Sequence, residues 1–113
     1  MKGLESIFAK AFEAEAERRG FVLLDRNPAP FAFPLYKTEE WVIGAMMKTM
    51  FPETTVTITF SPQNPPADSS RQHMIKCEAE WIPDSKKWLL PGGECTTEEL
   101  ISKAFDQMAV AAI

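Results

Sequence analysis

Near the middle of the chain, residues 54–60 read Thr54-Thr55-Val56-Thr57-Ile58-Thr59-Phe60. Large apolar side chains alternate with threonines, and successive side chains of a β-strand point to opposite faces of a sheet. The period of two predicts a strand that buries Val56, Ile58 and Phe60 and turns its threonines toward solvent. One buried and one wetted face are common in antiparallel sheets.

A second alternating segment follows this strand. In residues 72–82 the apolar side chains share one face with His73, and polar side chains occupy the other. The polar, proline-rich residues 61–70 between the two segments predict a loop with local disorder that joins two strands rather than two domains. A turn at 83–86 and a return strand at 87–90 come next, and Pro91-Gly92-Gly93 breaks the chain.

Amphipathic helices are predicted on both sides of these strands. Residues 4–19 carry an apolar face at helical spacing, and Gly20 follows as a C-terminal cap. Residues 97–112 repeat the pattern, whereas residues 21–24 are too short and too apolar for a helix and predict a buried strand. The apolar faces consist of Leu4, Ile7, Phe8, Ala11 and Phe12 in the first helix, and of Leu100, Ile101, Ala104, Phe105, Met108 and Ala112 in the second.

Residues 41–51 fit both a helical and an alternating template. The preceding Thr38-Glu39-Glu40 resembles a helix start, because threonine can cap a helix and acids are favoured in its first turn. Gly44 weakens a helix. We favour the helix over the strand, and Pro52 would end either element.

These elements predict a single α+β domain over residues 1–113, in the order α-β-α-β-β-β-α. Consecutive strands joined by turns or by one loop favour an antiparallel meander of three or four strands. The N- and C-terminal helices would cover its apolar face, which makes a two-layer sandwich.

Composition excludes several classes of protein. The 113 residues are 45% hydrophobic and 25% charged, as in ordinary globular domains. A net charge of −4 argues against nucleic-acid binding, which uses basic surfaces. Two cysteines are too few for a disulfide framework, the N-terminus lacks a signal-peptide core, and no apolar run approaches the roughly 18 residues of a membrane span. We therefore expect a cytoplasmic protein with reduced thiols and with no metal or other cofactor.

Few side chains point to catalysis. His73 is the only histidine, and in a strand it lies about 13 Å from Cys77, too far for one to activate the other. Cys95 precedes a helix, where thiol pKa values fall, but no second histidine exists to serve it. Glu78 and Glu80 on one strand face are about 6.6 Å apart, which suits glycosidase carboxylates and surface acids equally. We expect no enzyme; the alternative is a small enzyme or ligand-binding domain that uses Cys95 or the surface carboxylates.

A surplus of aromatic and methionine side chains indicates a docking surface. The predicted helices and strands already supply a core, and binding energy at interfaces concentrates in a few aromatic side chains. Methionine is common on adaptable binding surfaces. We expect a small module that docks a protein partner, such as an inhibitor, immunity or anti-defence accessory protein; the competing explanation is a second folded core. The predicted partner-binding residues are Phe31, Phe33, Tyr36, Trp41, Met47 and Met50.

Overall fold

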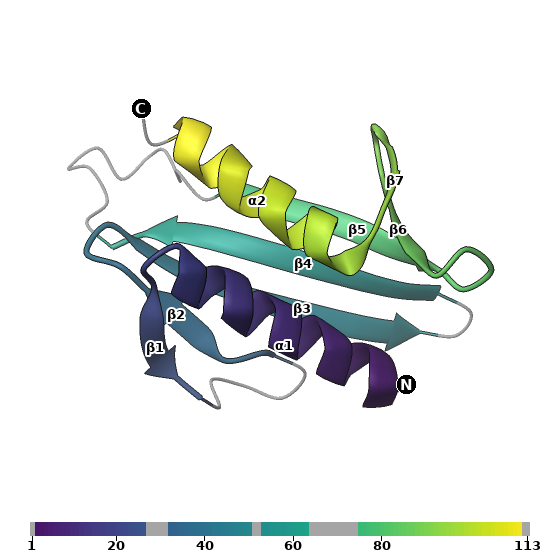
Figure 1. Cartoon of the computed structure of the whole chain (residues 1–113), viewed down its shortest axis with the longest axis horizontal. Coiled ribbons are helices and arrows are strands. Elements are labelled where there is room, and N and C mark those ends of the chain that lie inside the picture. Colours follow the sequence, from purple (N-terminus) through teal and green to yellow (C-terminus); the bar gives the residue numbers. More distant parts are fainter. Residues whose placement is uncertain (1, 27–31, 51–52, 64–74, 112–113) are drawn as a thin grey trace.

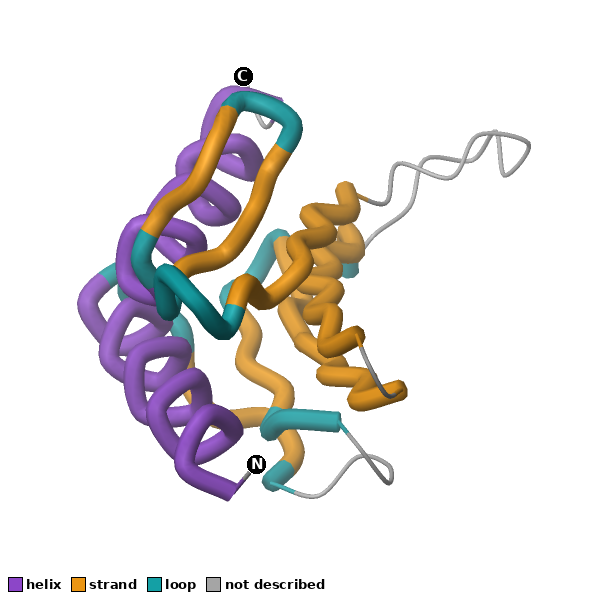
Figure 2. The backbone as a smooth tube through the Cα atoms, turned by 90° about the vertical axis from the view of Figure 1, so that its right-hand side faces the viewer, coloured by secondary structure: helices purple, strands orange, loops and turns teal. Residues whose placement is uncertain are grey.

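The computed structural model describes residues 2–26, 32–50, 53–63 and 75–111, which form an α+β fold with a seven-stranded antiparallel sheet and two helices (Figure 1). The elements are α1 (Lys2–Arg18), β1 (Val22–Asp25), β2 (Leu35–Lys37), β3 (Trp41–Met50), β4 (Glu53–Pro62), β5 (Ile75–Ile82), β6 (Lys87–Leu90), β7 (Gly93–Cys95) and α2 (Thr97–Ala111). Each strand pairs with the next one along the chain, so the sheet is a meander from β1 to β7. Both helices lie over one face of the sheet (Figure 2), and no described element covers the other face.

The long central strands confirm the prediction for residues 54–60. Val56, Ile58 and Phe60 of β4 are fully buried, and the threonines between them are partly exposed on the opposite face. All ten residues of β4 pair with β3, from Trp41 opposite Pro62 to Met50 opposite Glu53. A slip of one residue would turn every buried side chain of β4 to the wrong face, so the alternation fixes this register.

The preference for a helix over residues 41–51 is wrong, because residues 41–50 form strand β3. The Thr38 hydroxyl accepts hydrogen bonds from the backbone N–H groups of Glu40 (3.3 Å) and Trp41 (3.1 Å), as a helix cap would. The Thr38 N–H donates to the Trp41 carbonyl at 2.9 Å and closes a hairpin turn instead. Pairing with β4 along the whole strand overrides the local resemblance to a helix start.

The sheet is also wider than the three or four strands predicted. Strand β2 forms directly after Pro34, at the end of a segment that also carries Pro28 and Pro30, and β7 begins at Gly93, the last residue of the predicted break. Strand β1 is an exposed sheet edge rather than a buried strand, since Val22, Leu23 and Leu24 all remain accessible. Among the described residues the order is therefore α, seven strands, α, and strand β3 stands where the middle helix was predicted.

Helix α1 begins and ends close to its predicted bounds. Gly20 adopts a positive φ of 84°, and the N–H groups of Gly20 and Phe21 donate to the carbonyls of Glu17 (3.1 Å) and Ala16 (2.9 Å). This pair of bonds is the Schellman ending that a glycine after the last turn favours. The buried stripe is narrower than predicted, because Ile7 is exposed while Phe8 and Phe12 are buried.

Helix α2 is held at its start by two contacts. The Thr96 hydroxyl accepts from the Glu99 N–H at 3.2 Å, and the Glu99 carboxylate accepts from the Thr96 N–H at 2.9 Å, which makes a capping box. The next residue, Thr97, accepts a buried 3.0 Å hydrogen bond from the indole N–H of Trp88 on β6. The predicted apolar face is buried from Leu100 to Met108.

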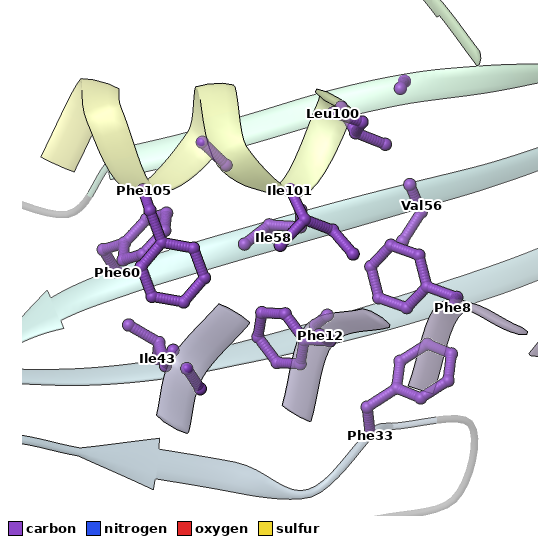
Figure 3. Packing of buried hydrophobic residues seen from close by; sticks show 14 of the residues in the cluster. Phe8, Phe12, Phe33, Ile43, Val56, Ile58, Phe60, Leu100, Ile101 and Phe105 are labelled. Atoms are coloured by element: carbon purple, nitrogen blue, oxygen red, sulfur yellow. The ribbon is translucent and has the colours of Figure 1, made fainter. Parts of the chain in front are cut away.

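The core lies between the sheet and the two helices (Figure 3). Phe105 of α2 meets Phe60 of β4 and Phe12 of α1, with ring centroids 5.4 and 6.1 Å apart. Arg19, just after α1, reaches α2 by a 2.8 Å ion pair with Asp106 and places its guanidinium 5.3 Å from the Phe105 ring centre. Within the described residues, neither helix has the length and apolar character needed to cross a membrane.

Candidate functional site

Three of the predicted docking residues belong to the core. Phe33, Tyr36 and Met47 are buried, which favours the competing explanation, packing into a core, for these three side chains. The rings of Phe33 and Phe8 pack at a tilt of 40° with centroids 4.8 Å apart, and Tyr36 meets Phe12 edge-on at 5.6 Å. These side chains do not form a second core; they extend the main one beneath α1.

The remaining predicted residues are placed only in part. Trp41 is partly exposed and packs against the same core. Phe31 lies outside the described residues, as does the side chain of Met50. The predicted docking set therefore does not form one accessible patch, and its role in partner binding stays a prediction.

The sheet face opposite the helices is called the outer face below. Its side chains change from mostly apolar on β3 to threonine on β4 and to charged on β5. On β3 its side chains are Val42 and Met46 with Gly44 between them, because Ile43 and Ala45 point inward. On β4, Ser61 stands opposite Val42, and two threonines stand opposite Gly44 and Met46. The column on β5 is charged. The outward residues in these columns are Val42, Gly44, Met46 and Lys48 on β3, Thr55, Thr57 and Thr59 on β4, and Lys76, Glu78 and Glu80 on β5.

A hollow of about 240 Å³ lies on the apolar side of this face. Its described lining carries no charged residue. Gly44 forms the floor, and the Leu35 side chain of β2 lies across it, 2.5 Å from where a Cβ on Gly44 would stand. A Cβ at this position would require the end of the Leu35 side chain to shift. The walls are provided by Ala32, Leu35, Val42, Met46, Thr57 and Thr59.

Two lysines flank the hollow at its ends. Lys37 stands opposite Val42 on the neighbouring strand, and the exposed Lys48 follows Met46 by two residues on the same face. This arrangement of an apolar centre with a charged rim is typical of protein interfaces. The pattern could have been found in the sequence, since Val42 and Met46 are the second face of the strand template for residues 41–51.

The two cysteines do not have the environment of reactive thiols. Cys95 is the last residue of β7 and is buried, and burial raises the pKa of its thiol. Cys77 lies on the inner face of β5, partly exposed, and desolvation raises its pKa as well. A raised pKa keeps each group as the thiol at neutral pH, whereas the thiolate is the nucleophile. His73, the other residue weighed with Cys77, lies outside the described residues.

A larger space of about 680 Å³ opens beside β5. It is lined by Lys76, Cys77 and Glu78 of β5, by the turn after β6, and by Lys103 and Gln107 of α2. Glu80, the second of the two predicted carboxylates, is not among its lining residues. Within the described part of the chain, no three side chains of metal-binding type come together.

Comparison of the chain with known protein families, with curated proteins and with solved structures finds no match.

Proposed function

We propose that this chain is a small protein-binding module, not an enzyme, and that it docks a protein partner through the hollow on its outer face. The observation that carries this proposal is the uncharged lining around Gly44 on a sheet face that no described element covers. Met46 is the most accessible large apolar side chain there, with 43% of its surface exposed. The partner would insert an apolar side chain and place carboxylates near Lys37 and Lys48.

The size of the hollow favours a protein over a small molecule. Ligand pockets usually enclose about 300–1,000 Å³ and hold a few convergent polar groups. The hollow offers about 240 Å³ and is bordered by threonine hydroxyls that stay accessible. Such a surface gains most from a broad apolar contact with a polar rim.

The enzyme alternative has weaker support in the described residues. The space beside β5 contains Cys77, Glu78 and two lysines, but the raised pKa of the Cys77 thiol works against nucleophilic attack. Cys95 is buried away from that space. A cytoplasmic location remains part of the proposal, and it suits Cys77 and Cys95, both of which are free thiols.

A pair of matched variants tests the docking surface. Met46→Asp places a charge beside the hollow, and Leu89→Asp places the same charge on β6 at an almost identical exposure, 43% against 42%. Both positions are accessible, so each variant should keep nearly the melting temperature of the wild type. Purified wild type and both variants would be immobilised and incubated with extract of the native host, and the retained proteins quantified by mass spectrometry.

If the proposal holds, the wild type and Leu89→Asp retain at least one protein in equal amounts. Met46→Asp retains at least tenfold less of that protein, which corresponds to a loss of about 1.4 kcal/mol in binding free energy. Reconstitution of the same difference with that purified protein would complete the support. Retention that is the same for all three baits would mean that the hollow does not bind the partner, and the proposal would be wrong.

A further inference from the structure

One edge of strand β5 pairs with a described strand along only part of its length. Along its first edge, residues 75–80 pair with β4. Along its second edge only Glu80, Trp81 and Ile82 pair with β6. None of the described strands pairs with this second edge over residues 75–79, because the β6–β7 hairpin turns away to lie beside α2 (Figures 1 and 2).

The space of about 680 Å³ lies directly against this open edge. Three consecutive residues of β5, Lys76, Cys77 and Glu78, line it together. Lys103 and Gln107 of α2 line the same space, so it borders this edge of β5 on the side of the sheet that the helices cover. Exposed strand edges carry unpaired N–H and C=O groups and readily accept another strand.

The sequence of the open edge is complementary to itself. If a second β5 runs antiparallel with Cys77 opposite Cys77, then Lys76 stands opposite Glu78 of the second copy, and Glu78 opposite its Lys76. Both pairs lie on the outer face, where opposite charges across an antiparallel pair are stabilising. On the inner face, Ile75 would stand opposite Ala79 of the second copy. The paired residues are therefore complementary on both faces: oppositely charged on the outer face and apolar on the inner face.

We propose that two copies of this chain associate through the open edge of β5, antiparallel about a twofold axis at Cys77, and so join their sheets into one. A twofold interface uses the same patch on both copies, and the Lys-Cys-Glu order meets that condition. This proposal goes beyond the docking function, since it uses the strand edge and not the hollow around Gly44. The paired segment is short, so we expect a weak dimer with a dissociation constant in the micromolar range.

Charge exchange tests the register. Sedimentation velocity over a dilution series would measure the dimer constant of the wild type, Lys76→Glu, Glu78→Lys and the double exchange. Each single variant sets like charges opposite one another twice per dimer, and we expect dissociation constants at least tenfold higher. The double exchange restores two opposite-charge pairs and should return to within about threefold of the wild type. Lys48→Glu, an exposed charge change on β3, is the matched control and should leave the constant unchanged.

A chemical cross-link tests the axis independently. Residues directly opposite in an antiparallel pair have Cα atoms about 4.5–5.5 Å apart, within disulfide reach. Diamide, which takes up two electrons and two protons as two thiols join, should convert the wild type to a covalent dimer. The Cys95→Ser variant should react equally, because Cys95 is buried, and Cys77→Ser should give none.

Three results would overturn the proposal. One is a monomer at all concentrations up to about 1 mM. Another is a dimer that both single charge variants leave intact, especially one that Leu24→Lys on the exposed edge strand β1 disrupts. A third is a double exchange that fails to recover dimerisation while remaining folded by circular dichroism. Met46→Asp should not alter the dimer constant, so failure here and failure of the docking function are separate outcomes.

Discussion

Phe60→Ala removes the largest inward side chain of β4. Phe60 has 0% of its surface exposed, and its ring centroid lies 5.4 Å from that of Phe105 in an edge-on contact. Deleting roughly 150 Å² of buried aromatic surface at about 25 cal/mol per Å² forfeits about 4 kcal/mol. The lost ring contact adds about 1 kcal/mol, and partial collapse of the cavity offsets some of the total. We expect the free energy of unfolding to fall by about 3–5 kcal/mol, a large fraction of the stability of a small domain.

Thr57→Ala on the same strand is the control. Thr57 points to the outer face and is partly exposed, so its replacement should change the free energy of unfolding by about 0.5 kcal/mol or less. Urea titrations followed by tryptophan fluorescence, with the slope of each transition compared, would give both values. Similar losses in the two variants would contradict the assigned faces of β4 and the packing of Phe60 against α2.

The start of α2 offers three further tests. Thr96→Ala should lower the free energy of unfolding by about 1 kcal/mol, because the capping hydroxyl is lost; the hydrogen bonds from Thr96 also hold the pKa of Glu99 below its usual range. The stability due to Glu99 is therefore present at neutral pH and disappears as the pH falls below about 4, so wild type and Glu99→Gln should converge in acid and differ at pH 7. Trp88→Phe removes the buried N–H donor to Thr97 and should cost about 1–3 kcal/mol by thermal unfolding, whereas an unchanged melting temperature would argue against that bond.

Elements with an unambiguous period could be predicted from the sequence. The alternation in residues 54–60 gave the right faces for β4, and Gly20 marked the end of α1. Both signals are local: one is the period of the side chains, and the other is the freedom of glycine to adopt a positive φ.

Elements decided by distant pairing could not be predicted in the same way. Thr38 and Thr96 are each followed by a short run that contains two glutamates and then by apolar residues. Both hydroxyls accept backbone N–H groups two or three residues on. One leads into a strand and the other into a helix. The difference lies in β4, whose ten residues pair with β3, and such tertiary contacts override a weak local preference.

The candidate site was missed for a related reason. Aromatic side chains near prolines were expected at the surface, but Phe33 and Tyr36 are drawn under α1 by Phe8 and Phe12. The shape of the outer hollow instead depends on the absence of a side chain at Gly44, because the Leu35 side chain occupies the space beside the position of a Cβ. Composition shows the glycine but not the neighbour that lies over it.

The ion pair between Arg19 and Asp106 joins residues 87 positions apart. Each strand pairs with its neighbour in sequence, so hairpins can form as the chain is synthesised. The cover over Phe60 is different, because Phe105 belongs to α2, which follows all seven described strands along the chain. During translation α1 is available before any strand, whereas the part of the inner face under α2 would stay exposed to water until α2 has been made, and completion of this part of the core would wait for that helix.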